Sequence, residues 1–153
     1  MAGFTRSTGP VGRLVACASI AVMAWGCAGG KVMPIKTQAE FDAVVLRSRQ
    51  PVLVDFYKGG CLTCILLDGD MDKLAEEYRG RAIIAKFELM TPVFVATSSE
   101  LKKRYDISFF PTVLLFVNGQ ETRRWAIHYS LNDYRQALNE AIAATSRPPA
   151  GPP

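Results

Sequence analysis

Residues 52–64 read Val-Leu-Val-Asp-Phe-Tyr-Lys-Gly-Gly-Cys-Leu-Thr-Cys. Residues 52–57 form an apolar run with one carboxylate, Asp55, which is typical of a central strand buried on both faces of a sheet. A short turn follows, and then an apolar helical pattern, so Cys61 and Cys64 fall at the start of a helix. A helix N-terminus carries roughly half a positive charge and favours thiolate over thiol at Cys61. Cys64, one turn later, is placed to close a disulfide, so the stretch indicates thiol–disulfide exchange.

The number of cysteines supports this interpretation. Of the four, Cys17 and Cys27 lie in an N-terminal leader, which leaves one close pair for the folded part. A disulfide across a four-residue loop stabilises a fold very little, so the pair is expected to take part in a reaction and not to stabilise the fold. Two alternatives stay open, namely inert cysteines and half of a zinc site. Zinc takes four ligands and His128 is the one other soft ligand after the leader, so no metal site is expected.

Residues 1–27 predict a signal peptide of the lipoprotein type. Arg6 and Arg13 precede an apolar stretch of about a dozen residues, whereas a membrane-spanning helix needs roughly 20. Small residues before Cys27 and glycines after it resemble the lipidation box of bacterial lipoproteins, although Trp25 departs from that pattern. The resemblance implies that Cys27 is acylated and that the protein is membrane-anchored, facing the periplasm or the cell exterior. Ordinary cleavage, an uncleaved anchor and a chance apolar leader are the alternatives.

The charge pattern excludes a nucleic-acid partner. Net charge is +4, and removing Arg6 and Arg13 from the 18 basic residues leaves 16 against 14 acidic ones. The remaining basic residues are dispersed, apart from short clusters at 102–104 and 123–124, which are typical of a solvated surface. A length of 153 residues with 49% hydrophobic content fits one domain with a real core, and we expect a monomer.

Local signals along the chain predict an α/β fold. Capping and turn residues delimit helices at 37–49, 61–78, 98–104 and from 130, and strands at 52–57, 82–89, 112–117 and 121–127, with a further short strand possible at 31–35. This order requires a central mixed sheet flanked by helices, ending in a β-hairpin plus a helix. The predicted organisation is a signal peptide at 1–27, a tether at 28–36, a domain at 37–145 and a disordered Pro-rich tail at 146–153.

Three motifs occur in a fixed order: Val54-Asp55-Phe56, Cys61-Leu62-Thr63-Cys64 and Phe110-Pro111-Thr112. Together they resemble the thioredoxin family over about residues 37–144. The resemblance implies a thioredoxin-like fold and a protein disulfide oxidoreductase that needs no cofactor beyond its redox-active Cys61–Cys64 disulfide. It also implies protein thiols or disulfides as substrates and a membrane or soluble thiol redox partner.

The resemblance assigns a role to each member of these motifs. Cys61 attacks a substrate disulfide and Cys64 resolves the mixed disulfide. Pro111 follows a cis peptide bond and faces the cysteines, and Phe110 and Thr112 beside it bind substrate. The alternative is a trans proline that merely begins a strand.

Asp55 is the expected proton acceptor for Cys64, because burial raises the pKa of a carboxyl group. The alternative is a carboxylate at a polar edge that pairs with Lys58 or Lys86. Lys86 matches a lysine that the family places near its buried aspartate. Lys58 either supports Asp55 in the same way or is simply solvated.

The chain departs from the family pattern at several places. Gly60 replaces the aromatic residue that the family has before the first cysteine, and Leu62-Thr63 replaces the Gly-Pro between the cysteines. Gly69 replaces the proline that kinks the redox helix, and Ile127 replaces a glycine near the substrate groove. The loop at 91–99 is longer, and its residues 93–95 form either an apolar flap or an extension of a core strand. The substrate and the direction of electron flow therefore stay open. The rival hypothesis is a non-catalytic thioredoxin-fold module that binds extended peptides.

Overall fold

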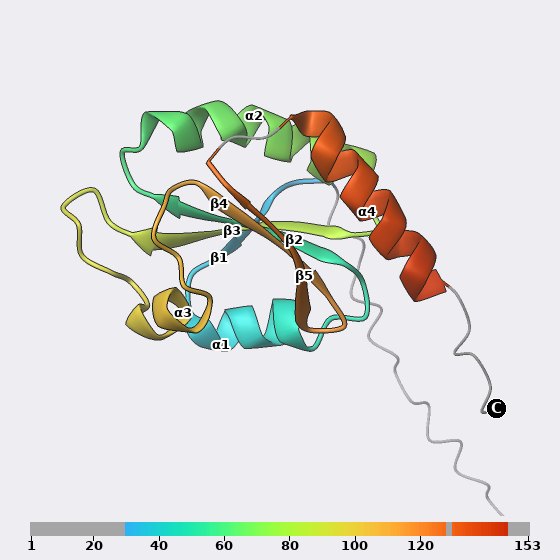
Figure 1. Cartoon of the computed structure of the whole chain (residues 1–153), viewed down its shortest axis with the longest axis horizontal. Coiled ribbons are helices and arrows are strands. Elements are labelled where there is room, and N and C mark those ends of the chain that lie inside the picture. The colour runs from blue at the N-terminus through green and yellow to red at the C-terminus, as the bar shows by residue number, and fades with distance from the viewer. Residues whose placement is uncertain (1–29, 128–129, 147–153) are drawn as a thin grey trace, which may run out of the picture.

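The structure is a computed structural model, and it describes residues 30–127 and 130–146. Five strands form one sheet between two layers of helices (Figure 1). The strands are β1 (Met33–Ile35), β2 (Val52–Lys58), β3 (Ile83–Met90), β4 (Thr112–Val117) and β5 (Gln120–Ala126). The helices are α1 (Gln38–Phe41), its π-helical continuation η1 (Asp42–Leu46), α2 (Leu62–Glu77), α3 (Ser99–Arg104) and α4 (Leu131–Ser146).

The predicted mixed sheet is confirmed. Its strand order is β1-β3-β2-β4-β5, with β1, β3 and β2 parallel and with β4 and β5 antiparallel to their neighbours. Strand β1 corresponds to the short strand that was possible at 31–35, so the sheet begins within residues assigned to a tether. Within the described ranges, no helix is both long and apolar enough to cross a membrane. Residues 1–29, 128–129 and 147–153, including Cys17, Cys27 and His128, lie outside the description.

Each face of the sheet has its own apolar core. On the face covered by α2 and α4, Leu53 packs with side chains of both helices (Figure 1). On the opposite face, covered by α1 and α3, Val54 and Phe56 pack in an aromatic cluster around Phe41. Successive side chains of a strand point to opposite faces. Asp55 therefore points to the same face as Leu53, towards α2.

Side chains that cap the backbone fix where the helices begin. Thr37 and Ser98 accept hydrogen bonds from N–H groups three residues ahead at 3.2 Å, and Ser130 does so at 3.4 Å. The first helix was expected to continue to about Arg49, and that boundary is wrong. The helix widens into η1, where the Arg47 N–H bonds to the Asp42 carbonyl, and it ends at Leu46.

The β4–β5 turn also contacts the end of the first helix. Asn118 and Gly119 both have positive φ, 51° and 75°, as the tight hairpin turn requires. A Cβ atom on Gly119 would overlap the backbone carbonyl of Leu46. Glycine is thus required here both for its backbone conformation and for a close approach between two segments.

We expect Gly119→Ala to lower the free energy of unfolding by about 2 kcal/mol, because it adds a clash to an unfavourable φ. Chemical denaturation of the oxidised protein measures this. The matched control is Gly69→Ala in α2, where a Cβ atom would meet no other atom within 4 Å. It should raise the free energy of unfolding by about 0.5–1 kcal/mol through helix propensity. Equal effects of the two substitutions would contradict the packing described here.

Candidate active site

Cys61 is the N-cap residue of α2 and is joined to Cys64 by a disulfide, with their Cα atoms 5.3 Å apart. The Cys61 Sγ accepts a hydrogen bond from the Cys64 backbone N–H at 3.3 Å and lies 3.1 Å from the Thr63 hydroxyl oxygen. Cys61 is half-buried, whereas Cys64 is buried with 4% exposure. The exposed sulfur is therefore at the positive end of the helix, where a thiolate is favoured.

The turn between β2 and α2 brings Cys61 to this position. Gly60 has φ of +71°, a conformation that favours glycine, and the Cys61 N–H bonds to the Lys58 carbonyl at 3.3 Å. Helix α2 then runs through Gly69 without interruption to Glu77. The cysteine pair is thus held at the start of α2, just after the C-terminal end of the central strand.

Asp55 is buried in the middle of β2, with 1% exposure. Its Oδ1 atom has no hydrogen-bond partner among the described residues. Burial, reinforced by the negative charge of Asp68 and partly opposed by Lys86, raises the pKa of Asp55 from 3.8 to about 7. Strand β2 lies between β3 and β4, so Asp55 is not at an edge of the sheet. A carboxyl group that gains and loses its proton near neutral pH suits proton transfer.

Lys86 is opposite Asp55 in the β2–β3 register, but its ammonium group pairs with Asp68 of α2 at 3.2 Å. The sequence analysis did not identify Asp68 as a partner of Lys86. Its spacing was the available signal, since residues four apart lie on one helix face and Asp68 follows Cys64 by one turn. The Lys86 ammonium group therefore has a carboxylate partner in Asp68, while it still partly lowers the pKa of Asp55.

Lys58 contacts an aromatic ring at the active site. Its ammonium group lies 3.5 Å from the centroid of the Phe94 ring, a cation–π contact. The charges that change the pKa of Asp55 are those of Asp68 and Lys86. Lys58 instead lines a hollow beside Cys61, described below.

The Phe110–Pro111 peptide bond is cis, as the resemblance implied. Phe110 is partly buried and lines the same hollow as Cys61, so the structure brings these two predicted site residues together. Thr112 is buried, and its hydroxyl group donates to the Phe109 carbonyl at 2.7 Å, so it shapes the loop from beneath. The Ile127 N–H donates to the Pro111 carbonyl at 2.9 Å.

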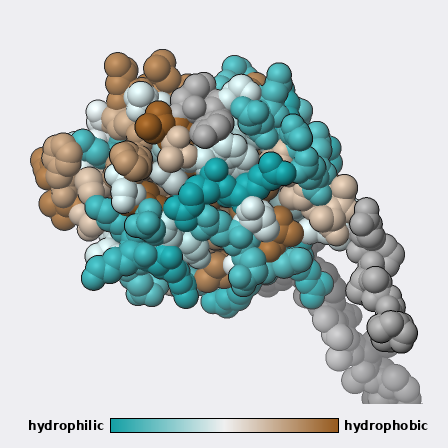
Figure 2. Space-filling view, in the orientation of Figure 1, coloured by the Kyte–Doolittle hydropathy of each residue, from teal (hydrophilic) through white to brown (hydrophobic). Residues whose placement is uncertain are grey.

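Large apolar side chains are exposed around the cysteine pair. They come from the first turns of α2, the β3–α3 loop, the segment before Pro111 and the end of β5: Leu62, Ile65, Leu66, Val93, Phe94, Val95, Phe109 and Ile127. Figure 2 shows hydrophobic atoms gathered over the start of α2 and over the β3–α3 loop, while hydrophilic atoms cover much of the remaining visible face. We call these eight residues the apolar rim. Sequence reasoning identified residues 93–95 as a possible flap but missed Phe109.

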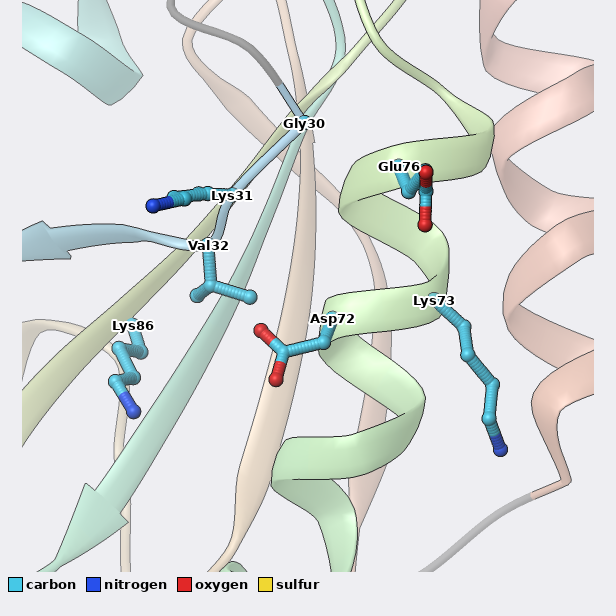
Figure 3. Close-up of a pocket in the computed structure, with 7 residues that line it drawn as sticks. All are labelled: Gly30, Lys31, Val32, Asp72, Lys73, Glu76 and Lys86. Carbon is cyan, nitrogen blue, oxygen red and sulfur yellow. The ribbon is translucent and has the colours of Figure 1, made fainter.

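One hollow lies beside these residues, and a second lies away from them. One, of about 450 Å³, contains Cys61 together with Phe94, Phe109 and Phe110. The other lies between the segment before β1 and the second half of α2, with charged groups of both signs around it, including Lys31, Asp72 and Glu76 (Figure 3). It contains neither cysteine. Over the described ranges, no group of three or more His, Cys, Asp or Glu residues could hold a metal ion.

Comparison with known families identifies the fold and its chemistry. Residues 32–143 match the family model for thioredoxin. The chain belongs to the thioredoxin family. Its Cys61–Cys64 pair is the redox-active disulfide of a thiol–disulfide oxidoreductase, and enzymes of this family carry out the exchange with the two cysteines themselves, without a cofactor. The family acts on protein thiols.

Individual thioredoxins agree with the family match. The chain is 34% identical over 88 residues to a bifunctional thioredoxin reductase/thioredoxin of Mycobacterium leprae (strain TN), covering 58% of this chain and 18% of that protein. It is 33% identical over 81 residues to a thioredoxin of Griffithsia pacifica, covering 53% and 69%. A mutant thioredoxin of Halobacterium salinarum NRC-1 shares the fold with a TM-score of 0.65 at 23% identity, covering 76% of this chain and 96% of that one.

We expect Asp55→Asn to stabilise the oxidised protein at about pH 8 but not near pH 4. The folded state holds a proton on Asp55 up to about pH 7, whereas the unfolded chain loses it near 3.8. Asp55 therefore makes its full contribution to stability below pH 3.8, and this contribution is lost as the pH rises to about 7. The loss in the free energy of unfolding is at most about 4 kcal/mol. Urea unfolding at the two pH values measures the difference between variant and wild type.

Two further variants identify the cause of the raised pKa. Asp68→Asn removes a like charge and releases Lys86, both of which lower the pKa of Asp55, so less stability should be lost between the two pH values. Asp72→Asn, on the same helix, removes an acid that does not act on Asp55 and should behave as wild type. An equal loss in wild type and Asp55→Asn would show that Asp55 is not responsible.

Proposed function

We propose that this protein exchanges disulfides with protein substrates outside the cytoplasm while it is tethered to a membrane. The observation that carries the proposal is the position of Cys61, a half-buried sulfur at the start of α2 within the apolar rim. Exposed apolar patches rimmed by polar residues mark surfaces that bind other proteins. Small thiols need no such surface, so the rim favours polypeptide substrates.

In the reducing direction, the Cys61 thiolate attacks one sulfur of a substrate disulfide. A bond forms between Cys61 Sγ and that sulfur, the substrate S–S bond breaks, and the second substrate sulfur leaves as a thiolate and takes a proton. The product is a mixed disulfide. The half-exposed position of Cys61 allows this contact, while Cys64 beneath it is shielded from the substrate.

Resolution of the mixed disulfide requires Cys64 to lose its proton. Asp55 lies on the face of the sheet that α2 covers, and its pKa of about 7 lets it accept that proton near neutral pH. The Cys64 thiolate then attacks Cys61 Sγ, the mixed disulfide breaks, and the second substrate thiol is released. Two electrons have passed to the substrate and the Cys61–Cys64 disulfide has formed. A dithiol donor must return the pair to its reduced form, and the reverse sequence oxidises a substrate.

The tether would leave from the end of the domain opposite to the cysteines. A Cβ atom on Gly30 would lie 2.8 Å from the Cα atom of Glu76, so the first described residue contacts the last turn of α2 (Figure 3). Roughly 15 helical residues separate Cys61 from Glu76, or about 22 Å. If Cys27 carries the lipid, the cysteine pair faces away from the bilayer, towards partners in the aqueous compartment.

The rival function is a thioredoxin-fold module that binds extended peptides without turnover. It would use the same hollow and apolar rim. A pure binding protein has no need of a buried Asp55 with a raised pKa together with both cysteines. This combination favours the enzyme.

We expect protein lacking residues 1–27 to catalyse reduction of a protein disulfide by dithiothreitol. Cys61→Ser should abolish the activity, because it removes the attacking sulfur, and Cys64→Ser should accumulate mixed disulfides detectable by mass spectrometry. Asp55→Asn should slow resolution more than formation of the mixed disulfide, as measured by stopped-flow kinetics. Full activity of Cys61→Ser would refute the mechanism, and peptide binding without turnover by the wild type would favour the rival.

Mass spectrometry of the mature protein from a bacterial host tests the tether. We expect an N-terminal Cys27 carrying acyl chains, and Cys27→Ala should abolish the lipid modification. Two or more acyl chains give stable membrane attachment, whereas one gives only marginal binding. Cys27 precedes β1 by about six residues, at most roughly 20 Å of extended chain, so the domain would stay at the membrane surface. An unmodified start or a retained Met1 would refute the anchor and leave the redox function intact.

A further inference from the structure

The β3–α3 loop is an ordered turn that presents apolar side chains to solvent. The Phe94 N–H donates to the Thr91 carbonyl at 3.0 Å, and the Thr91 N–H donates to the Val95 carbonyl at 2.9 Å. Met90 and Ala96 form an isolated β-bridge beneath the turn. Phe94 is nevertheless 71% exposed, so the segment is a flap and not a strand of the core. Local hydrogen bonds therefore hold an aromatic ring in water at the edge of the active site.

Phe94 has a second unusual property. Its φ is +64°, in the left-handed region that residues with a side chain rarely adopt. Such conformations persist where the surrounding structure requires them, and they cluster at functional sites. The Lys58 ammonium group lies over the same ring. Charge and ring are thus fixed together on one wall of the hollow.

The hollow beside Cys61 combines aromatic walls with positive charge. Phe94, Phe109 and Phe110 supply the apolar surface, and Lys58 and Lys102 supply the charge. None of the residues that line it carries a carboxylate, and in the described part of the chain neither lysine pairs with an acid. Its unmatched charge is complementary to an acidic group.

The hollow adjoins the bond that forms during exchange. Bonded sulfur atoms are about 2 Å apart, so a substrate cysteine must come into direct contact with Cys61. The side chains next to that cysteine then meet the hollow. Its volume of about 450 Å³ lies within the range of pockets that bind small organic groups.

We propose that this hollow selects protein segments in which an aromatic or large aliphatic residue and an acidic residue flank the reacting cysteine. The apolar side chain packs against Phe94 and Phe109, and the carboxylate pairs with Lys58 or Lys102. The proposal rests on the proposed function, since it names the substrates of the same site. The long β3–α3 loop, through Phe94, makes this chain selective.

Single-turnover reduction of symmetric peptide disulfides tests the selection. Each peptide has one cysteine, flanked by Phe and Glu, Ala and Glu, Phe and Lys, or Ala and Lys, with both flanking orders made. Reduced protein is mixed with each dimer, quenched with acid and analysed by mass spectrometry. Of the two flanking orders, we expect the faster Phe/Glu dimer to react about tenfold faster than the Ala/Glu dimer of the same order. The reason is that burying part of an aromatic ring contributes about 1.4 kcal/mol. The Glu-over-Lys preference should be about threefold and should decrease with salt.

Matched variants separate the two contributions. Phe94→Ala should reduce the Phe-over-Ala preference to less than about twofold. Val93→Ala, in the same loop but outside the hollow, removes rim surface that is available to all the peptides, so it should change their rates alike and preserve the preference. Lys102→Glu should abolish or reverse the Glu-over-Lys preference. Lys103→Glu makes the same charge change at the adjacent residue, which does not line the hollow, and should preserve the preference.

Reduction of hydroxyethyl disulfide measures thiol–disulfide exchange without any contribution from the hollow, because this compound is small, uncharged and not aromatic. If the wild type reduces neither this compound nor any of the peptides, the proposed function fails. If the wild type reduces it but treats all the peptides alike, only the selection is refuted. Equal preferences in Phe94→Ala and Val93→Ala, or in Lys102→Glu and Lys103→Glu, likewise overturn the role of the hollow.

Discussion

A carboxyl group in the middle of a strand buried on both faces is the constraint on which the site depends. Apolar neighbours on β2 hold Asp55 away from water, and its Oδ1 has no partner among the described residues. The ammonium group of Lys86, which is opposite Asp55 in the β2–β3 register, pairs with Asp68. Had Lys86 bonded to Asp55 instead, the carboxylate would stay ionised at neutral pH and would be a poor proton acceptor. Burial is thus the main cause of the raised pKa of Asp55, and the negative charge of Asp68 adds to it.

The same strand also determines the position of the thiols. Strand β2 ends at Lys58, a glycine turn reverses the chain, and Cys61 becomes the cap of α2. Cys64, one turn later, falls on the buried face of the helix, the face directed towards Asp55 and the sheet. One sulfur is thus open to a substrate and the other is open only to the first. In the mechanism proposed above, a single continuous segment of the chain provides the nucleophile, the resolving thiol and the proton acceptor.

Much of this could be predicted from local sequence, because local interactions decide it. Thr37 and Ser98 each cap a helix through their own hydroxyl group, and Asn118-Gly119 forms the hairpin turn wherever the strands lie. The choice of Asp68 as the partner of Lys86 depends instead on how α2 is placed over the sheet, which no short pattern specifies. The contact of Lys58 with Phe94 likewise joins β2 to a loop whose path follows from its own backbone hydrogen bonds. The π-helical end of the first helix has no recognisable sequence signal.

In the selection proposed above, chemistry and substrate recognition use separate parts of the domain. The β3–α3 loop joins the sheet through the Met90–Ala96 bridge and through the Thr97 N–H, which donates to the Leu89 carbonyl at 3.1 Å; most of its other hydrogen bonds are internal. A change in the apolar side chains of this loop would therefore leave Asp55 and the cysteine pair undisturbed. The exposed rings have a cost, since apolar surface in water contributes nothing to folding and favours unwanted association. That cost is offset where a substrate covers the same surface, which explains why the apolar rim gathers at the end of the molecule that carries Cys61.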